Sequence, residues 1–203
     1  AGPRVARTQH GTGTWPTEPE CARTEGDPQM PDEPSSDLTR PPVPYPARCL
    51  SLPASDLSGY TRIVQSGGAQ YEAVRADGRW ERLRRMAGAD GAIYGVASQD
   101  RECPAEWYRY TVAVEAEAWH RRADAVDEEL YTLHIPASEW IAFALHDFGA
   151  QYGGFWQENP YSLIQRLGWE FNTSVGLHLD VYGSSYCSDH DSMEFWMPVR
   201  RPR

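Results

Sequence analysis

The order of predicted elements repeats along the chain, and this repetition restricts the fold more than any other sequence feature. Between residues 59 and 203, apolar residues with strand and helix spacing follow one another as strand, strand, helix, strand, strand, twice. The sequence therefore predicts an α+β fold of two units, about 59–118 and 130–203, related by a pseudo-twofold axis. Strands are predicted over residues 60–64, 70–75, 93–96, 107–115, 130–135, 140–146, 177–182 and 193–199, and helices over 79–86 and 159–167.

Prolines separate this region from the residues before it. Residues 1–58 hold 11 of the 16 prolines but only one of the eight tryptophans, Trp15. Because proline interrupts both helices and sheet ladders, this stretch is predicted to be a largely irregular, extended arm or linker. It offers no pair of apolar-periodic helices, so no helix-turn-helix is expected there. The domain that folds around a core is therefore expected over residues 59–203.

Charge and composition exclude several classes of function. The formal net charge is -10, and all 19 basic residues are arginine. An acidic chain is a poor partner for nucleic acid, and a chain without lysine cannot form a Schiff base. No apolar run approaches the roughly 20 residues of a membrane span, so we expect no membrane contact and a cytoplasmic protein. The four scattered cysteines are expected to be reduced, with a Cys21–Cys49 bridge as the alternative.

The last predicted strand places an acid beside a large aromatic residue. With period two, Met193, Phe195, Met197 and Val199 share one face, which is expected to be buried. Glu194 and Trp196 lie on the other face. An exposed acid on the wet face of an antiparallel strand is one interpretation. The other is a carboxylate among aromatic walls, which suits an organic cation through charge and cation–π attraction.

Six segments, in this order and spacing, are similar to a known family. They are Tyr60-Thr61-Arg62-Ile63-Val64, Trp80-Glu81-Arg82-Leu83, Ile93-Tyr94-Gly95-Val96, the run from Tyr108 to Glu115, Ile135-Pro136-Ala137, and the run from Met193 to Val199. Residues 59–201 resemble the GyrI-like effector-binding domain, a small-molecule module attached to many AraC- and MerR-type regulators and also found free-standing.

The resemblance implies two curved antiparallel sheets, each with a helix on its back, around a central ligand cleft. It also implies a buried glutamate in the last strand, which here is Glu194. Tyr71 is a further candidate for the aromatic walls, and ordinary core packing is the alternative for each aromatic. The predicted ligand-binding residues are Glu194, Trp196, Tyr94, Tyr108, Tyr110, Trp140, Phe143, Trp156 and Tyr182.

Three functions stay open on this basis. The first is a binding module, for drug sensing or sequestration, that captures amphipathic or cationic aromatic molecules. The second is a hydrolase that opens a cyclopropane or similarly strained ring of a natural product. There Glu194 would activate water, and Tyr108 and Tyr110 would polarise the substrate. The third is a protein-directed inhibitor, such as one of DNA gyrase. A monomer or a homodimer is expected.

No metal or cofactor is expected. The run from Cys187 to Asp191 contains ligating residue types, but adjacent side chains in a loop cannot all face one ion. The glycine pairs Gly67-Gly68 and Gly153-Gly154 are predicted to lie in turns, because neither stands in a phosphate-loop motif.

Overall fold

A computed structural model describes residues 43–99, 102–123 and 127–202, all within one compact unit, Thr39–Arg203. Within these described ranges, no helix is long and apolar enough to cross a membrane. Cys21 and most of the predicted arm lie outside them, so the alternative Cys21–Cys49 bridge stays untested.

The strands are β1 (Ala47–Leu52), β2 (Ser55–Val64), β3 (Ile93–Ser98), β4 (Tyr108–Glu115), β5 (Tyr131–Ile135), β6 (Ser138–Leu145), β7 (Glu170–Phe171), β8 (Leu177–Tyr182) and β9 (Met193–Arg200). The helices are α1 (Gly67–Ala76), α2 (Arg79–Ala87), α3 (Ala116–Arg122), α4 (Phe148–Gln157) and α5 (Pro160–Arg166).

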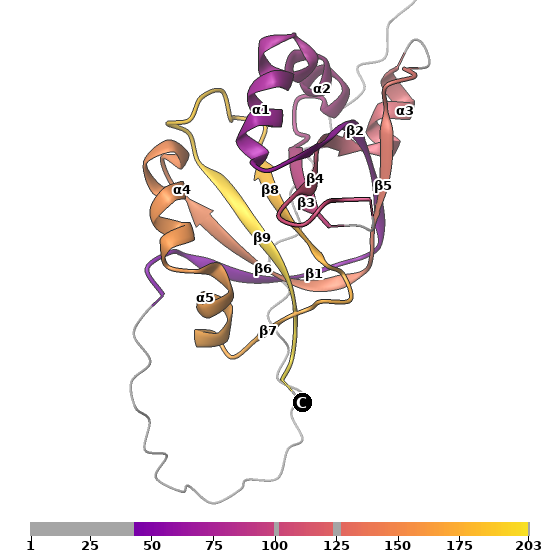
Figure 1. Ribbon diagram of the computed structural model, residues 1–203. Helices are drawn as coiled ribbons and strands as arrows, with labels where there is room; N and C mark the ends of the chain where they lie inside the picture. The colour runs from indigo at the N-terminus through magenta and orange to yellow at the C-terminus, as the bar shows by residue number, and fades with distance from the viewer. Residues whose placement is uncertain (1–42, 100–101, 124–126, 203) are drawn as a thin grey trace, which may run out of the picture. The chain divides into compact units, whose positions relative to one another are not determined.

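The strands form one antiparallel sheet whose order is symmetric about its centre. The order is β1-β6-β9-β8-β3-β4-β2-β5, with the short β7 paired to the end of β9 (Figure 1). Reading outward from the central β8–β3 pair, β9 matches β4, β6 matches β2 and β1 matches β5. This symmetric strand order agrees with the predicted duplication. Together with the helices, it confirms the α+β fold class. The two sheets implied by the resemblance are the halves of one curved sheet, continuous through the β3–β8 pairing.

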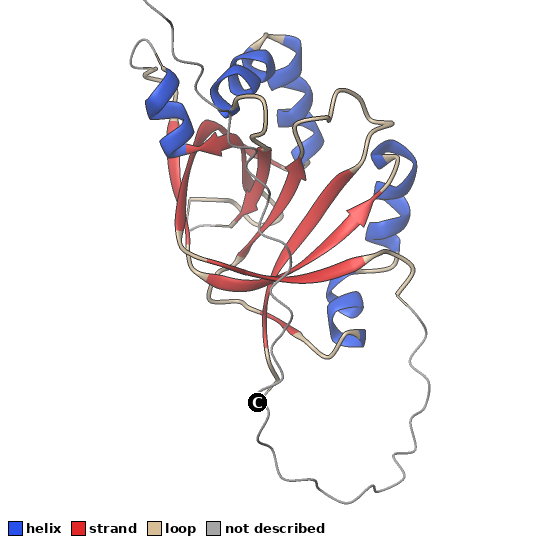
Figure 2. Cartoon of the chain, turned by 180° about the vertical axis from the view of Figure 1, so that it is seen from behind, coloured by secondary structure: helices blue, strands red, loops and turns tan. Residues whose placement is uncertain are grey.

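The two faces of the sheet carry separate cores. The helices of both halves lie on the outer side of the curved sheet (Figure 2), where Leu83 of α2 and Phe155 of α4 pack with Phe195 of β9 in one buried cluster. On the other face, Val96 of β3 and Trp140 of β6 belong to a second cluster. Because successive strand residues point to opposite faces, each buried strand divides its side chains between the two cores.

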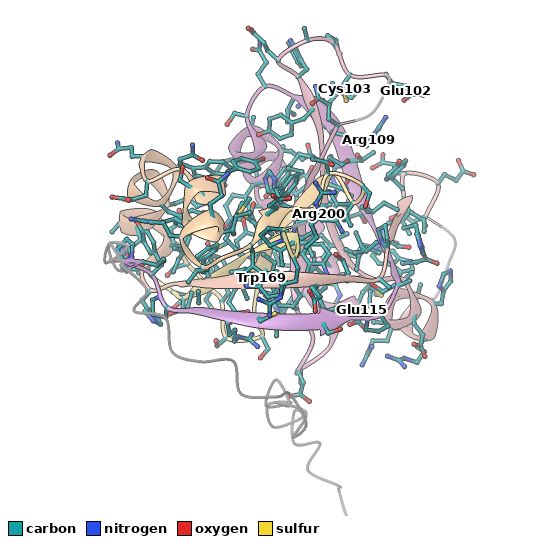
Figure 3. The ribbon with its side chains drawn as sticks, turned by 90° about the horizontal axis from the view of Figure 1, so that it is seen from below. Glu102, Cys103, Arg109, Glu115, Trp169 and Arg200 are labelled. Atoms are coloured by element: carbon teal, nitrogen blue, oxygen red, sulfur yellow. The ribbon has the colours of Figure 1, made fainter. Side chains whose placement is uncertain are left out.

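β4 shows this division clearly. Tyr108 and Tyr110 belong to the helix-covered side. Arg109 between them faces the other way, and its Nη2 donates a hydrogen bond to Glu102 Oε2 at 2.7 Å (Figure 3). The alternation predicted for residues 107–115 is therefore confirmed.

One predicted strand is a helix. Residues 70–75 were predicted to pair in the sheet, but they lie inside α1. Gln70, Tyr71 and Val74 are the buried residues of this helix, a spacing that matches one helical face. Because the segment is short, its apolar residues fit both periods, and contact with the sheet decides in favour of the helix. The repeated unit is therefore strand, two helices and two strands.

Helix α4 was not predicted, and the glycine pairs lie in helices rather than turns. Gly153 and Gly154 are in α4, while Gly67 and Gly68 form the first turn of α1. Glycine lowers helix propensity, so the sequence pattern of α4 is weak. By contrast, α5 follows its prediction closely, with Pro160 in the first turn and the Asn159 side chain accepting a hydrogen bond from the Tyr161 backbone N–H.

The sheet begins earlier than predicted. β1 and the first residues of β2 lie within the stretch predicted as an irregular arm, and β1 pairs with β6 along its whole length. Pro44 and Pro46 precede β1, and Pro53 lies in the turn between the two strands, so no proline interrupts either ladder. The prediction for residues 1–42 lies outside the described residues.

Candidate functional site

A cavity of about 610 Å³ lies on the helix-covered face, between α1 and α4 and above the central strands β3, β4 and β8. It therefore sits where the two halves of the duplication meet, as the resemblance implied. Its lining residues are Gln65, Ser66, Gly67, Gly68, Tyr71, Ala97, Ser98, Gln99, Tyr108, Tyr110, Phe148, Tyr152, Trp156, Tyr161, Phe171, Gly176, Leu177, His178, Asp180 and Tyr182.

Among the described residues that line the cavity, Asp180 is the only acidic one, and none is an arginine. It lies in the middle of β8, and the residue is 2% exposed. Its Oδ2 accepts a hydrogen bond from the Tyr110 hydroxyl at 2.6 Å. Its Oδ1 is buried and has no hydrogen-bond partner among the described residues. The carboxyl group is therefore buried, and only one of its two oxygens has a hydrogen-bond partner among the described residues.

Burial determines the ionisation of this group. Burial raises the pKa of Asp180 to about 7, although the hydrogen bond from Tyr110 favours the charged form. Near neutral pH the carboxyl is thus present in both protonated and ionised forms. A positive charge in the cavity would favour the ionised form.

Two glycines make room for Tyr110. Gly95 of β3 lies between β4 and β8, and a Cβ there would lie 2.1 Å from the Tyr110 hydroxyl oxygen. A Cβ at Gly67 would lie 2.7 Å from Tyr110 Cε2. Because neither residue has a side chain, the Tyr110 ring passes over β3 and reaches Asp180 on the next strand. Gly95 is therefore required for the Tyr110–Asp180 hydrogen bond.

Aromatic rings from both halves form the walls. Tyr71 of α1 stacks on Tyr182 with ring centroids 5.4 Å apart, and Phe148 of α4 contacts Tyr152 at 4.8 Å. Trp156 and Tyr161 are 37% and 39% exposed, so they form the open edge of the cavity. Such a wall offers ring faces to a flat or cationic ligand.

His178 belongs to the same face of β8 but adds no positive charge. It packs against Phe195 at 4.9 Å and Trp156 at 5.7 Å between ring centroids. Burial lowers the pKa of His178 to about 4, so the imidazole is neutral at pH 7.

The structure brings four of the nine predicted ligand-binding residues together in the cavity lining: Tyr108, Tyr110, Trp156 and Tyr182. The further candidate Tyr71 also lines it. Phe143 does not line it; the side chain is fully buried in the core and contacts Phe155 at 5.4 Å. Tyr94 and Trp140 belong to the cluster on the opposite face of the sheet. In the sheet register Tyr94 pairs with Val181, and Tyr182 pairs with Ile93. Directly paired residues share a face, so Tyr94 and Tyr182 point to opposite faces of the sheet.

Glu194 and Trp196 also lie on the opposite face, which corrects the prediction of a pocket glutamate. Both Glu194 oxygens accept hydrogen bonds from Arg48 Nη2 at 2.8 Å, and Oε2 also accepts one from Trp196 Nε1 at 2.8 Å. Arg48 lies on β1, within the stretch predicted to be an irregular arm. The carboxylate of the cavity is therefore Asp180 and not Glu194.

Asp180, His178, Phe148 and Tyr152 were missed. A signal for the first two was present, since residues 177–182 alternate and place His178, Asp180 and Tyr182 on one face. An acid inside a buried strand is the same kind of signal as the one seen at Glu194. Phe148 and Tyr152 were missed because they belong to α4, the unpredicted helix.

No protein-family model matches this chain, and no curated protein matches it in sequence. Several solved structures match it in three dimensions. SAV2435 bound to tetraphenylphosphonium superposes with a TM-score of 0.57 at 14% identity, covering 76% of this chain and 94% of that one. A putative bacterial transcription regulation protein from Staphylococcus aureus MU50 gives 0.55 at 14% identity, with 77% and 99% covered. EcmrR, in a complex with DNA, gives 0.51 at 11% identity, with 78% and 58% covered.

These likenesses show the fold. The chain has the same arrangement of strands and helices as these proteins, which confirms the fold predicted from the GyrI-like resemblance. At 11–14% identity they carry no residue of the site from one protein to another.

Proposed function

We propose that this protein binds amphipathic aromatic molecules, and aromatic organic cations above all, in the cavity around Asp180. The observation that carries the proposal is the buried Asp180 carboxyl: among the described residues, one of its oxygens has no hydrogen-bond partner, and no cationic side chain lines the cavity beside it. A buried charge normally has a partner of opposite sign. An organic cation in the cavity would supply it.

The walls support a flat or bulky organic ligand. A volume of about 610 Å³ lies within the range of sites for drug-sized molecules, roughly 300–1,000 Å³. The space is lined by Tyr152, Phe148 and Trp156 from α4 and by Tyr71 and Tyr108 from the first half. Ring faces attract cations, and they attract them more strongly where water is excluded. The overall charge of -10 also favours the approach of cations over anions.

The ligand of one structural relative agrees with this chemistry. SAV2435, which shares the fold, was solved with tetraphenylphosphonium, a cation surrounded by four aromatic rings. This supports an aromatic cation as the first compound to test. A module of this kind would serve in drug sensing or in sequestration.

The test is a calorimetric titration of the protein with tetraphenylphosphonium and with neutral triphenylphosphine oxide. We expect the Asp180→Asn variant to bind the cation about tenfold or more weakly, because a charge-assisted interaction is lost. The neutral compound should bind both proteins alike. Glu194→Gln is the matched control, since it removes the same charge from the other face. Equal affinity of Asp180→Asn and wild type for the cation would contradict the proposal.

A second candidate function rests on the ionisation of Asp180. A carboxyl whose pKa is about 7 is suited to accept a proton from water near neutral pH, as a general base does. The hydroxyls of Tyr108 and Tyr152 line the same cavity as donors for a substrate carbonyl. In the hydrolase hypothesis, Asp180 thus takes the role predicted for Glu194.

Mass spectrometry separates this candidate from simple binding. A hydrolase would add one water to a cyclopropane-bearing compound, and the Asp180→Asn variant would not. If the compound is recovered unchanged while still binding saturably, the protein is a binding module only.

A further inference from the structure

A second cavity, of about 380 Å³, lies between α2, the end of α1 and the loop that joins β8 to β9. Its lining residues differ from those of the cavity around Asp180. The two spaces share an aromatic wall, since the Tyr71 hydroxyl of the first lies 2.8 Å from the Tyr186 hydroxyl of the second. The second cavity is thus a separate space in contact with the first.

Its charge is opposite to that of the protein as a whole. Among the described residues, three arginines line this cavity, Arg75, Arg84 and Arg85, against one acidic residue, Glu81. The three arginines lie in the last turns of α1 and α2. In a chain with a net charge of -10, this is a local concentration of positive charge. Such a cavity attracts anions.

Arg84 is held in place by backbone carbonyls. Its Nη1 donates to the Gly91 carbonyl and its Nη2 to the Gly183 carbonyl, both at 3.1 Å. Among the described residues no carboxylate pairs with it, whereas Arg82 on the same helix pairs with Asp127 at 2.7 Å. Burial lowers the pKa of Arg84, so its charge is unfavourable where it stands. An anion in the cavity would offset this cost.

The remaining groups indicate which anion fits. A guanidinium has five N–H donors, and the two carbonyl contacts leave others available to a planar or tetrahedral oxyanion. Arg75 already pairs with Asp189 at 3.3 Å, so Arg84 and Arg85 are the main donors. The Ser184 side chain adds a hydroxyl to the lining, and Trp80 adds an aromatic ring.

We propose that this second cavity binds a phosphoryl group, with Arg84 and Arg85 as its principal ligands. The group could belong to free phosphate or to a phosphate monoester whose organic part contacts Trp80. The site stands independently of the function proposed for the first cavity.

The experiment is a titration calorimetry series at constant ionic strength with inorganic phosphate and with phenyl phosphate. We expect saturable binding to the wild type, with a dissociation constant raised about tenfold or more in Arg84→Gln and about threefold in Arg85→Gln. Arg121→Gln removes the same charge from the surface of α3 and should leave the constant unchanged. Asp180→Asn should also leave it unchanged. Tighter binding of phenyl phosphate identifies a monoester site, and equal binding a site for the free anion.

Because Arg84 holds two loops through their carbonyls, its variant is first checked by circular dichroism and thermal unfolding. If Arg84→Gln does not fold, Arg85→Gln carries the test, since no hydrogen bond links its side chain to another described residue. The proposal is overturned if neither compound binds saturably up to about 10 mM. It is also overturned if Arg121→Gln weakens binding as much as Arg85→Gln, because the effect would then come from net charge alone.

Discussion

Asp180 and Glu194 lie on neighbouring paired strands, and the sheet turns them to opposite faces. Glu194 accepts hydrogen bonds from a guanidinium and an indole, and its side chain is 29% exposed. Asp180 accepts one hydrogen bond from a tyrosine and is buried. Within the part of the chain that the structure describes, a cation neutralises the Glu194 carboxylate and none neutralises that of Asp180. An acid beside an aromatic ring is therefore not enough to predict a cation-binding site. Such a site is expected where the fold buries an acid without a partner.

The largest expected effect concerns the cost of charging Asp180. A carboxyl whose pKa is raised in the folded state binds more protons there than in the unfolded chain. The free energy of unfolding should therefore fall as the pH rises from about 4 to about 7. Asparagine does not titrate, so Asp180→Asn should be more stable than the wild type at about pH 8 by a few kcal/mol, roughly 4 at most. At about pH 4 this advantage should vanish.

Urea unfolding at several pH values measures this difference. Glu194→Gln serves as the control, because its carboxylate is already paired with Arg48. A stability difference between Asp180→Asn and the wild type that stays constant with pH would show that Asp180 is not the titrating group.

The next effect concerns the space that Gly95 leaves for the Tyr110 side chain. Gly95→Ala should lower the free energy of unfolding by about 1–3 kcal/mol, because its Cβ would collide with the Tyr110 hydroxyl and displace it from Asp180. Gly153→Ala in α4 is the matched control. A Cβ there meets nothing within 4 Å, and alanine favours the helix by up to about 1 kcal/mol. Both are read from urea unfolding curves, and equal stability of the two variants would contradict the geometry of the site.

A smaller effect is the pH dependence of cation binding. Tetraphenylphosphonium has no titrating group, so any change in its affinity reports on the protein. Below the pKa of Asp180, which is about 7, the cation must displace a proton. Its affinity should therefore rise with pH by up to about tenfold per unit and level off above neutrality. Fluorescence titrations across this range check the slope. In Asp180→Asn the profile should be flat, and a slope that persists there would assign the effect to another group.

The smallest effect is expected on the other face. Glu194→Gln should cost less than about 1 kcal/mol of stability, because the ion pair with Arg48 is partly exposed and screened by water. Cation affinity should stay within about twofold of the wild type. A tenfold loss of cation binding in this variant would restore Glu194 as the acid of the site.

The sequence predicted well which residues of a strand share a face of the sheet. It did not predict which of the two faces holds the cavity. Met193, Phe195 and Met197 are buried as the alternation predicted, and Glu194 lies opposite them. Both faces of this sheet are covered, one by helices and the other by side chains that meet inside its curvature. Alternation alone does not tell the two apart. The partner of Glu194, Arg48, is far away in sequence, so its ion pair was invisible before the fold was known.

Helices α1 and α4 were not predicted for a related reason. In residues 70–75 the apolar residues fit a strand as well as a helix, and in α4 the glycines weaken the helical pattern. Both helices form because each has a face to bury against the sheet, which is a tertiary effect. Helix α4 carries Phe148, Tyr152 and Trp156. Because this helix was not predicted, the predicted site lacked the cavity wall that it forms. The duplication, by contrast, was readable because it repeats over more than a hundred residues.

The central claim is that a bound cation completes an unpaired, buried carboxyl. The most direct measurement is a carbon-detected NMR titration of the Asp180 side-chain carboxyl, with and without tetraphenylphosphonium, assigned with Asp180→Asn. We predict a midpoint near 7 in the free protein and a shift of at least about one unit to lower pH when the cation is bound. A carboxyl that is already fully ionised at about pH 5 in the free protein, or whose midpoint does not move on binding, would contradict the account.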